Sequence, residues 1–195
     1  MTALKDKWNT FYHGKALDTC KPCNVLHENA FLLPSAGRAL DLACGLGANA
    51  VFMAKQGLDV SAWDISEVAL EQLQAVADLR NLSITTQIIE ITCASSMPEE
   101  CFDIIVVSRF LDRALTNAII AMLKNGGLLF YQTYTQIKAT SSGPNNPDYL
   151  LAPQELLQLF APLKPVFYRE NALVGNVQKG LRNEAQFIGQ KIYLP

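Results

Sequence analysis

Short apolar runs alternate with amphipathic stretches along the first two thirds of the chain. Five apolar runs have the length and the flanking polar residues typical of buried strands, at 38–43, 59–63, 84–91, 102–107 and 128–134. Three intervals between them have helical periodicity, at 47–56, 66–80 and 115–124. Strand–helix–strand repetition at this spacing predicts an α/β fold with a doubly wound parallel sheet.

The last third of the chain breaks this alternation. Residues 135–152 are rich in Ser, Gly, Pro and Asn, which predicts a long loop, and loops of this length are usually functional or mobile. Pro153 is expected to open a helix that ends at Phe160. Two β-like runs follow, at 165–170 and 185–194, separated by a polar, irregular segment. We therefore expect a C-terminal antiparallel hairpin that completes a seven-stranded mixed sheet.

The 195 residues fit one domain of ordinary size. Residues 1–37 are expected to form an N-terminal cover segment, with one helix at 24–33 over the mouth of the sheet. The core then spans 38–134, and 135–195 supply the loop, the helix and the terminal hairpin.

Composition narrows the class of protein. Half of the residues are hydrophobic and 17% are charged, which makes a large core available and excludes global disorder. Lys124 and the Asn-Gly-Gly after it interrupt the most apolar stretch, at 118–131, so no membrane span is predicted. No apolar signal segment opens the chain, and the five cysteines suit reduced thiols, so a cytoplasmic location is expected. The net charge is −2 and the basic residues are dispersed, so a nucleic-acid partner is not favoured.

A glycine-rich turn carries the candidate chemistry. Residues 40–50, Leu-Asp-Leu-Ala-Cys-Gly-Leu-Gly-Ala-Asn-Ala, lead from a strand into a helix at the sheet edge where doubly wound folds bind ligands. Gly45 and Gly47 let the backbone approach a ligand closely, and a helix N-terminus favours a carboxylate or phosphate. Asp64 closes the second strand, where a carboxylate can accept both hydroxyl protons of a ribose. The pattern predicts a nucleoside with an anionic end.

Two ligand classes satisfy this pattern. The spacing Gly45-x-Gly47-x-x-Ala50 also fits a dinucleotide-binding turn, so an NAD(P)-dependent oxidoreductase is an alternative. Asp41, inside the first strand, would repel a pyrophosphate but could pair with an ammonium group. S-adenosylmethionine has an ammonium, a carboxylate, a sulfonium and a ribose, and so fits better than NAD.

These motifs resemble those of class I S-adenosylmethionine-dependent methyltransferases. Residues 40–47 are similar to their motif I, and Trp-Asp-Ile-Ser at 63–66 is similar to motif II. The runs at 102–107 and 124–130 resemble their fourth strand and the turn into their fifth. Within the superfamily, Trp-Asn-Thr-Phe-Tyr at 8–12 and the compact size resemble the small-molecule, tellurite-resistance (TehB-like) branch. The resemblance implies a Rossmann-like fold and methyl transfer from S-adenosylmethionine to a small-molecule acceptor, with S-adenosylhomocysteine as product.

The resemblance also implies roles for individual residues. Asp41 would contact the methionine ammonium, directly or through water, and Asp64 would hold the ribose hydroxyls. Ile65 would pack on the adenine, Glu90 would bind its amino group, and Ser108 would begin the loop that faces the transferable methyl group. The other expected cofactor contacts line the methionine part or flank the adenine: Ala43, Cys44, Gly45, Gly47, Asn49 and Ile91.

Candidates for contact with the acceptor are Tyr12, Arg109 and Arg113. Cys44 is interpreted as a small buried hydrophobic residue rather than a nucleophile. A further group lies close together in the sequence with a spacing that zinc could use: His13, Cys20, Cys23 and His27. Ordinary loop and helix positions are the favoured interpretation of that group, and no metal is predicted.

Two further functions stay open alongside the oxidoreductase. An RNA methyltransferase is possible because folded loops can assemble a basic patch that the linear sequence hides. A non-catalytic subunit that binds S-adenosylmethionine is the other. No strong general base is predicted; a thiol or chalcogen oxyanion would scarcely need one, whereas a hydroxyl or amine acceptor could.

Overall fold

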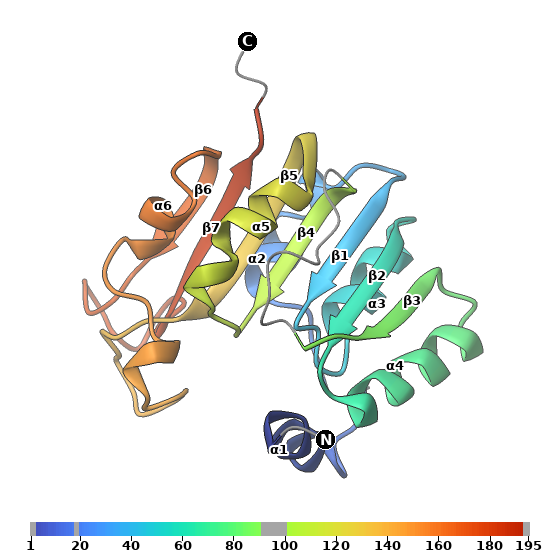
Figure 1. The fold of residues 1–195 in the computed structure, drawn as a ribbon. Helices are drawn as coiled ribbons and strands as arrows, with labels where there is room; N and C mark the ends of the chain where they lie inside the picture. The colour runs from blue at the N-terminus through green and yellow to red at the C-terminus, as the bar shows by residue number, and fades with distance from the viewer. Residues whose placement is uncertain (1–2, 18–19, 91–100, 193–195) are drawn as a thin grey trace.

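A mixed sheet forms the centre of the computed structural model, which describes residues 3–17, 20–90 and 101–192. Its seven strands have the order β3-β2-β1-β4-β5-β7-β6 (Figure 1). Their bounds are β1 (Arg38–Leu42), β2 (Asp59–Asp64), β3 (Ile84–Ile88), β4 (Phe102–Ser108), β5 (Leu123–Tyr134), β6 (Lys164–Glu170) and β7 (Glu184–Gln190). Pairing is parallel from β3 through β5 and antiparallel between β7 and its two neighbours. The predicted fold class is confirmed.

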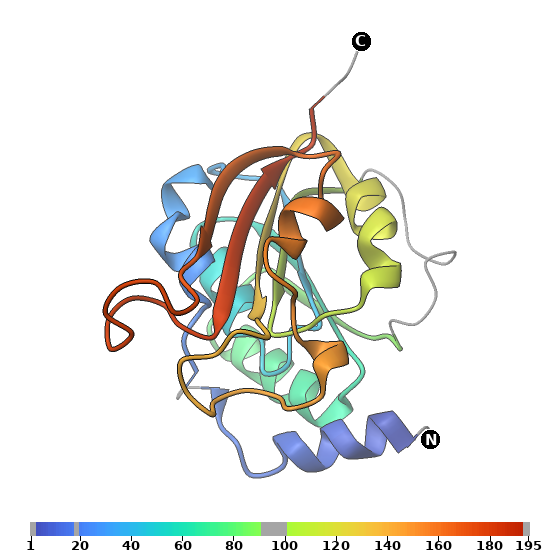
Figure 2. The ribbon, with the colours of Figure 1, turned by 90° about the vertical axis from the view of Figure 1, so that its left-hand side faces the viewer.

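Helices cover both faces of this sheet (Figures 1 and 2). The α-helices are α1 (Ala3–Tyr12), α2 (Asn24–Glu28), α3 (Ala48–Lys55), α4 (Glu67–Leu79), α5 (Thr116–Met122) and α6 (Glu155–Leu159). Short 3₁₀ turns are η2 (Ala30–Leu32), η4 (Arg113–Leu115) and η5 (Pro147–Tyr149). The first core lies between the sheet and α2, α3 and α4, and the second core lies between the sheet and α5 and α6. None of the helices in the described part of the chain has the length and apolar character that crossing a bilayer requires.

Strand residues alternate between the two cores. In β1, Ala39 belongs to the first core and Leu40 to the second, and in β4 Ile104 and Ile105 alternate in the same way. Strands covered on both faces need apolar side chains at nearly every position. Asp41 breaks this rule within β1, since it has an ionisable carboxyl group and is fully buried.

The N-terminal segment differs from the prediction. Residues predicted as a loose start form α1, and the helix predicted at 24–33 is divided into α2 and η2 at Asn29. Asn29 leaves the helical conformation (φ −117°, ψ 27°), and its Nδ2 donates to the carbonyl oxygen of Val25 at 2.9 Å. A side chain that bonds back to the preceding turn competes with helix continuation, which explains the break.

The Asn-Gly-Gly at 125–127 lies inside a strand, although a turn at the end of a helix is predicted there. α5 ends at Met122, and Leu123 already belongs to β5. The register between β4 and β5 shifts here, as in a β-bulge. A Cβ atom at Gly127 would lie 2.9 Å from the carbonyl oxygen of Lys124, so the backbone requires glycine at this position.

Two other element bounds are shorter than predicted. β3 ends at Ile88, within the run predicted at 84–91. α6 begins at Glu155 instead of Pro153, because Gln154 adopts a left-handed conformation (φ +61°) that interrupts the helix.

The C-terminal strands β6 and β7 form the predicted antiparallel pair. The connection between them, at 171–183, projects from the sheet in Figure 2. β7 ends at Gln190, short of the predicted end at 194, which lies outside the described residues.

The long loop at 135–152 is anchored by a side chain from the hairpin. Asn183 accepts a hydrogen bond at Oδ1 from the N–H of Ala139 at 2.7 Å, and its Nδ2 donates to Oγ1 of Thr140 at 2.6 Å. The Arg113 guanidinium holds the other end of the loop through backbone carbonyls. The loop is therefore held at both ends by side chains from outside it, and its mobility stays a prediction.

Replacing Asn183 tests this anchor. Asn183 has a left-handed backbone (φ +64°), which glycine tolerates and alanine does not. N183G loses the amide hydrogen bonds, and we expect it to lower the free energy of unfolding by about 1–2 kcal/mol. N183A adds backbone strain and should cost roughly 1 kcal/mol more. Urea denaturation measures both, and equal stabilities of the two variants would contradict the role of the backbone conformation.

Candidate active site

The glycine turn lies at the carboxyl edge of the sheet, between β1 and α3. Its residues have positive φ angles at Ala43 (+55°), Gly45 (+53°) and Gly47 (+79°). A left-handed backbone at alanine costs about 1–3 kcal/mol, and strain of this kind clusters at functional sites. A Cβ atom at Gly47 would collide with the side chain of Leu73, so glycine there also allows α4 to pack against the turn.

Asp64 joins the turn to the start of α4. Its Oδ2 accepts from the N–H of Gly45 at 2.7 Å, and its Oδ1 accepts from the N–H of Ser66 at 2.8 Å. Burial raises the pKa of this carboxyl group, because the loss of hydration outweighs these hydrogen bonds. Each carboxylate oxygen can accept more than one hydrogen bond, so Asp64 keeps capacity for a pair of hydroxyl groups.

Asp41 lies behind the turn. Its Oδ2 accepts from the N–H of Ala50 at 3.0 Å and its Oδ1 from Nδ2 of Asn49 at 3.3 Å, which anchors the first turn of α3. Burial is the main cause that raises its pKa to about 8. A fully buried carboxyl group does not reach a ligand directly, so of the two predicted contacts with an ammonium this geometry allows the indirect one.

Asn49 connects three parts of the chain. Its Nδ2 donates to Oγ of Ser108 at the end of β4, at 3.0 Å, as well as to Asp41. Its Oδ1 accepts from the N–H of Cys23, just before α2, at 2.9 Å. The amide is buried, so it orients Ser108 and the cover segment relative to the turn.

Tyr12 reaches the glycine turn from α1. A Cβ atom at Gly45 would collide with its hydroxyl group, and burial, followed by the charge of Asp64, raises its pKa. α1 is held at the start of α4, where Oδ1 of Asn9 accepts from Oγ of Ser66 at 2.9 Å. Both ribbon views place α1 beyond the carboxyl ends of the parallel strands. The cover over the turn is thus α1, and not the predicted helix at 24–33.

The two candidate arginines have different surroundings. Arg109 follows β4 with a left-handed backbone (φ +55°), and its exposed side chain lies 3.5 Å from Glu184, Nε to Oε1. Arg113 forms an ion pair with Glu155 and donates to two carbonyls of the long loop. Its guanidinium therefore holds the long loop against α6, and its contact with an acceptor stays a prediction.

The predicted adenine contacts are only partly described. Ile65 is half-buried directly after Asp64. Glu90 is exposed two residues beyond β3, and its neighbour Ile89 donates its N–H to the carbonyl oxygen of Asp64 at 2.9 Å. Ile91 lies outside the described residues. These contacts stay predictions.

The cysteines and histidines near the N-terminus do not gather. Within residues 3–17, 20–90 and 101–192, no group of three or more His, Cys, Asp or Glu side chains is placed to hold a metal ion. Burial raises the pKa of Cys23 to about 12, and the His27 ring lies 5.7 Å from the ring of Phe52. Burial also raises the pKa of Cys44, which keeps its thiol protonated and unreactive at neutral pH.

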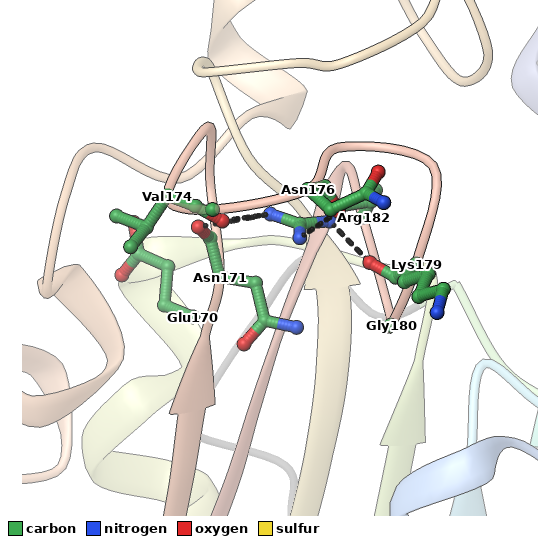
Figure 3. Close-up of a pocket in the computed structure, with 8 residues that line it drawn as sticks. Glu170, Asn171, Val174, Asn176, Lys179, Gly180 and Arg182 are labelled. Atoms are coloured by element: carbon green, nitrogen blue, oxygen red, sulfur yellow. Dashed lines mark hydrogen bonds between the residues drawn. The ribbon is translucent and has the colours of Figure 1, made fainter.

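A hollow of about 510 Å³ lies away from the glycine turn, in the connection between β6 and β7 (Figure 3). Its lining residues are Glu170, Asn171, Val174, Gly175, Asn176, Lys179, Gly180 and Arg182. The Arg182 guanidinium donates to five backbone carbonyls of this connection. It therefore stabilises the shape of the loop, and its donors are not directed at a ligand.

Three buried polar side chains form a feature that the sequence analysis missed. We call Gln132, Glu184 and Gln186 the buried polar layer. Oε1 of Gln132 accepts from the N–H of Val25 at 2.8 Å and from Nε2 of Gln186 at 3.0 Å, and Nε2 of Gln132 donates to Glu184. The signal that could have revealed Gln132 is a polar residue directly after the apolar run at 128–131, whereas Glu184 and Gln186 belong to a run that alternates polar and apolar residues.

Comparison with known proteins places this geometry in context. A sequence model of the family described as tellurite resistance protein TehB matches residues 4–172. A Haemophilus influenzae protein described as a probable S-adenosyl-L-methionine-dependent methyltransferase TehB is 30% identical over 181 residues, covering 85% of this chain and 56% of its own. A ubiquinone biosynthesis O-methyltransferase from Xanthomonas axonopodis pv. citri is 28% identical over 141 residues, covering 68% and 57%. The chain thus spans little more than half the length of these curated relatives.

Solved structures share the fold. The crystal structure of TehB from Haemophilus influenzae gives a TM-score of 0.72 at 22% identity, covering 94% of this chain and 67% of that one. Geranyl diphosphate C-methyltransferase from Streptomyces coelicolor, solved with Mg²⁺, geranyl diphosphate and S-adenosyl-L-homocysteine, gives 0.70 at 12% identity and covers 98% of both chains.

The raised pKa of Asp41 predicts a pH-dependent stability. The group has a pKa of 3.8 when unperturbed and about 8 in the folded state, so the folded chain binds more protons than the unfolded chain between these values. The free energy of unfolding should therefore fall as pH rises through this window, by up to about 1.4 kcal/mol per pH unit. Asp64 acts in the same direction, because its pKa is also raised.

D41N should flatten this dependence, because it removes the titrating group. Urea denaturation at pH 5, 6, 7 and 8 provides the measurement, and D59N, on the exposed first residue of β2, is the matched control. A D41N variant whose stability falls as steeply as that of the wild type would contradict the assignment.

Proposed function

The chain belongs to the family of the tellurite resistance protein TehB, and on that premise we propose that it transfers the methyl group of S-adenosylmethionine to a small-molecule acceptor. One observation carries the proposal beyond family membership. Asp64 accepts N–H groups from both Gly45 and Ser66, which puts a carboxylate with spare lone pairs beside a glycine turn and a helix start. That arrangement suits a nucleoside with a charged end.

The residues of the turn fit S-adenosylmethionine in their donor and acceptor chemistry. Asp64 would accept the two ribose hydroxyl groups, and Ile65 would lie against the adenine. Gly45 and Gly47 would bring the backbone close to the methionine part, and Asn49, held by Asp41, would orient groups around its ammonium. The proposal also assigns cofactor contacts to the backbone of Ala43, the packing of Cys44, and the side chains of Glu90 and Ser108.

The strand order gives the cofactor a direction. With the ribose at the end of β2 and the methionine part at the end of β1, the methyl group would face β4, where Ser108 and Arg109 lie. When bound, S-adenosylmethionine supplies a methyl group on a sulfonium that is already a good leaving group. The chain's own residues then align the acceptor and exclude water, which can lower a barrier by several kcal/mol. Tyr12 and α1 supply the cover on the side of the glycine turn.

The remaining parts of the proposal concern the whole chain. Residues 1–195 act as one methyltransferase domain in which 38–134 bind the cofactor. The protein works in the cytoplasm on a small molecule, without a membrane or nucleic-acid partner.

Binding of S-adenosylhomocysteine tests the cofactor assignment. This product should raise the Tm of the wild type, whereas NAD and NADP should not, because a ligand of the folded state stabilises it by RT ln(1 + [L]/Kd). D64A removes two charge-assisted hydrogen bonds to the ribose, about 2–4 kcal/mol together, and should raise the Kd roughly 30- to 1,000-fold in calorimetry.

The matched control is D59A, at the other end of β2, where the carboxylate accepts from Oγ of Ser83. It should leave the Kd unchanged. A D64A protein that melts cooperatively and binds S-adenosylhomocysteine like the wild type would overturn the placement of the ribose.

Incubation with bulk tRNA and labelled S-adenosylmethionine tests the size of the acceptor. Neither filter binding at low salt nor methyl incorporation into tRNA is expected, because the basic residues are dispersed. Micromolar binding that weakens steeply with salt, together with methylated RNA, would replace the small-molecule acceptor by RNA.

A further inference from the structure

The buried polar layer lies one strand beyond the proposed methyl group. Gln132 on β5 pairs directly with Ser108 on β4 and with Gln186 on β7. The N–H of Arg109 donates to the carbonyl oxygen of Gln132 at 2.8 Å, so the loop after β4 begins at this layer. An acceptor approaching from the side opposite the ribose would meet Arg109, Gln132 and Glu184.

The layer is linked to the cofactor residues through the segment before α2. Cys23 donates its N–H to Asn49, and two residues later Val25 donates its N–H to Gln132. Backbone groups of one short segment thus hold both the amide beside the glycine turn and the amide beside Glu184. Because Cys23 and Val25 are two residues apart in the chain, the backbone between them limits the distance between Asn49 and Gln132.

Acceptor atoms outnumber donors in this layer. One carboxylate oxygen of Glu184, Oε2, accepts from the Gln132 amide. The other, Oε1, lies 3.5 Å from Nε of Arg109, which is long for a charge-assisted hydrogen bond. Oε1 of Gln186 is buried and has no hydrogen-bond partner among the described residues. Gln186 is fully buried, so a ligand that brings a proton would meet the carboxylate of Glu184, whereas an oxyanion would be repelled by that carboxylate.

The charges around Glu184 are compatible with proton transfer. The charged or titratable groups with which the structure gives it an interaction are Arg109, at the end of β4, and the thiol of Cys23. Arg109 is 65% exposed, while Glu184 is 9% exposed, so solvent screens the arginine more than the carboxylate. The carboxylate is held in place by Gln132 and by its position as the first residue of β7.

We propose that Glu184 accepts the proton of an acceptor that carries a hydroxyl group, in the methyl transfer proposed above, on which this inference rests. The O–H bond of the acceptor breaks, and its proton goes to a carboxylate oxygen of Glu184. The electron pair left on the acceptor forms the new bond to the methyl carbon, while the C–S bond of the sulfonium breaks and its electron pair stays on sulfur.

Cofactor binding and turnover are measured separately, so that the two proposals can fail separately. Calorimetry with S-adenosylhomocysteine on the wild type, E184Q and E184D should give Kd values within about twofold of one another, because Glu184 lies outside the cofactor residues. The control is E28Q, which removes the same kind of Glu–Arg pair, 3.3 Å from Arg169, on the exposed surface of α2. A wild type that does not bind S-adenosylhomocysteine overturns the proposed function and this inference with it.

Turnover is then followed with methyl-labelled S-adenosylmethionine and two sets of probes. Catechol and phenol have a hydroxyl proton to lose, while selenite and dimethyl selenide present a nucleophilic selenium atom that carries no proton. The wild type should methylate protic probes with a kcat that falls toward acid pH. E184Q should lower that kcat about 100-fold or more with little change in KM, and should remove the acid limb. E184D should recover part of the activity, and E28Q should match the wild type.

A purely structural role for Glu184 gives different results. It would lower Tm and turnover on every probe alike, without changing the shape of the pH profile. If E184Q retains the wild-type kcat on protic probes, or if the wild type methylates selenite or dimethyl selenide but no protic probe, Glu184 is not the proton acceptor.

Discussion

Buried carboxylates that accept backbone N–H groups hold the carboxyl edge of the sheet in shape. Asp64 fixes the turn after β1 to the start of α4, and Asp41 fixes the first turn of α3 from behind. Without them, the N–H groups of Gly45 in the turn and of Ala50 and Ser66 at the two helix starts would lose their hydrogen-bond partners. The pKa values of both carboxyl groups are raised because burial removes water from them.

The cofactor half of the site is predictable from the sequence because its information is local. The strand, the glycine turn and the helix are consecutive, and Asp64 follows at a distance that one helix and one strand determine. The same reasoning places Ser66 at the start of α4, where its side chain accepts from the N–H of Ala69. The predicted bounds of helices and strands were wrong in two places. At Asn29 a single side chain ends the helix, and at Gly127 the backbone approaches its neighbours closely.

The region proposed to meet the acceptor is not predictable in the same way, because its residues come from distant segments. Glu184 begins a strand whose alternation of polar and apolar residues also fits a surface strand. It becomes a buried group only because β7 inserts between β5 and β6 and α2 packs over it. α1 was missed for a related reason. It has apolar residues at helical spacing, Leu4, Trp8 and Phe11, but buries none of its residues fully, so composition alone gives it little weight.

Asn49 links the glycine turn to two segments that lie far from it in the sequence. The side-chain amide of Asn49 is hydrogen-bonded to Cys23, 26 residues toward the N-terminus, and to Ser108, 59 residues toward the C-terminus. A molecule that immobilises the turn therefore also restrains the start of α2 and the end of β4. Protease cleavage near those two segments then becomes a measure of how much of the protein carries ligand, even though neither segment belongs to the glycine turn.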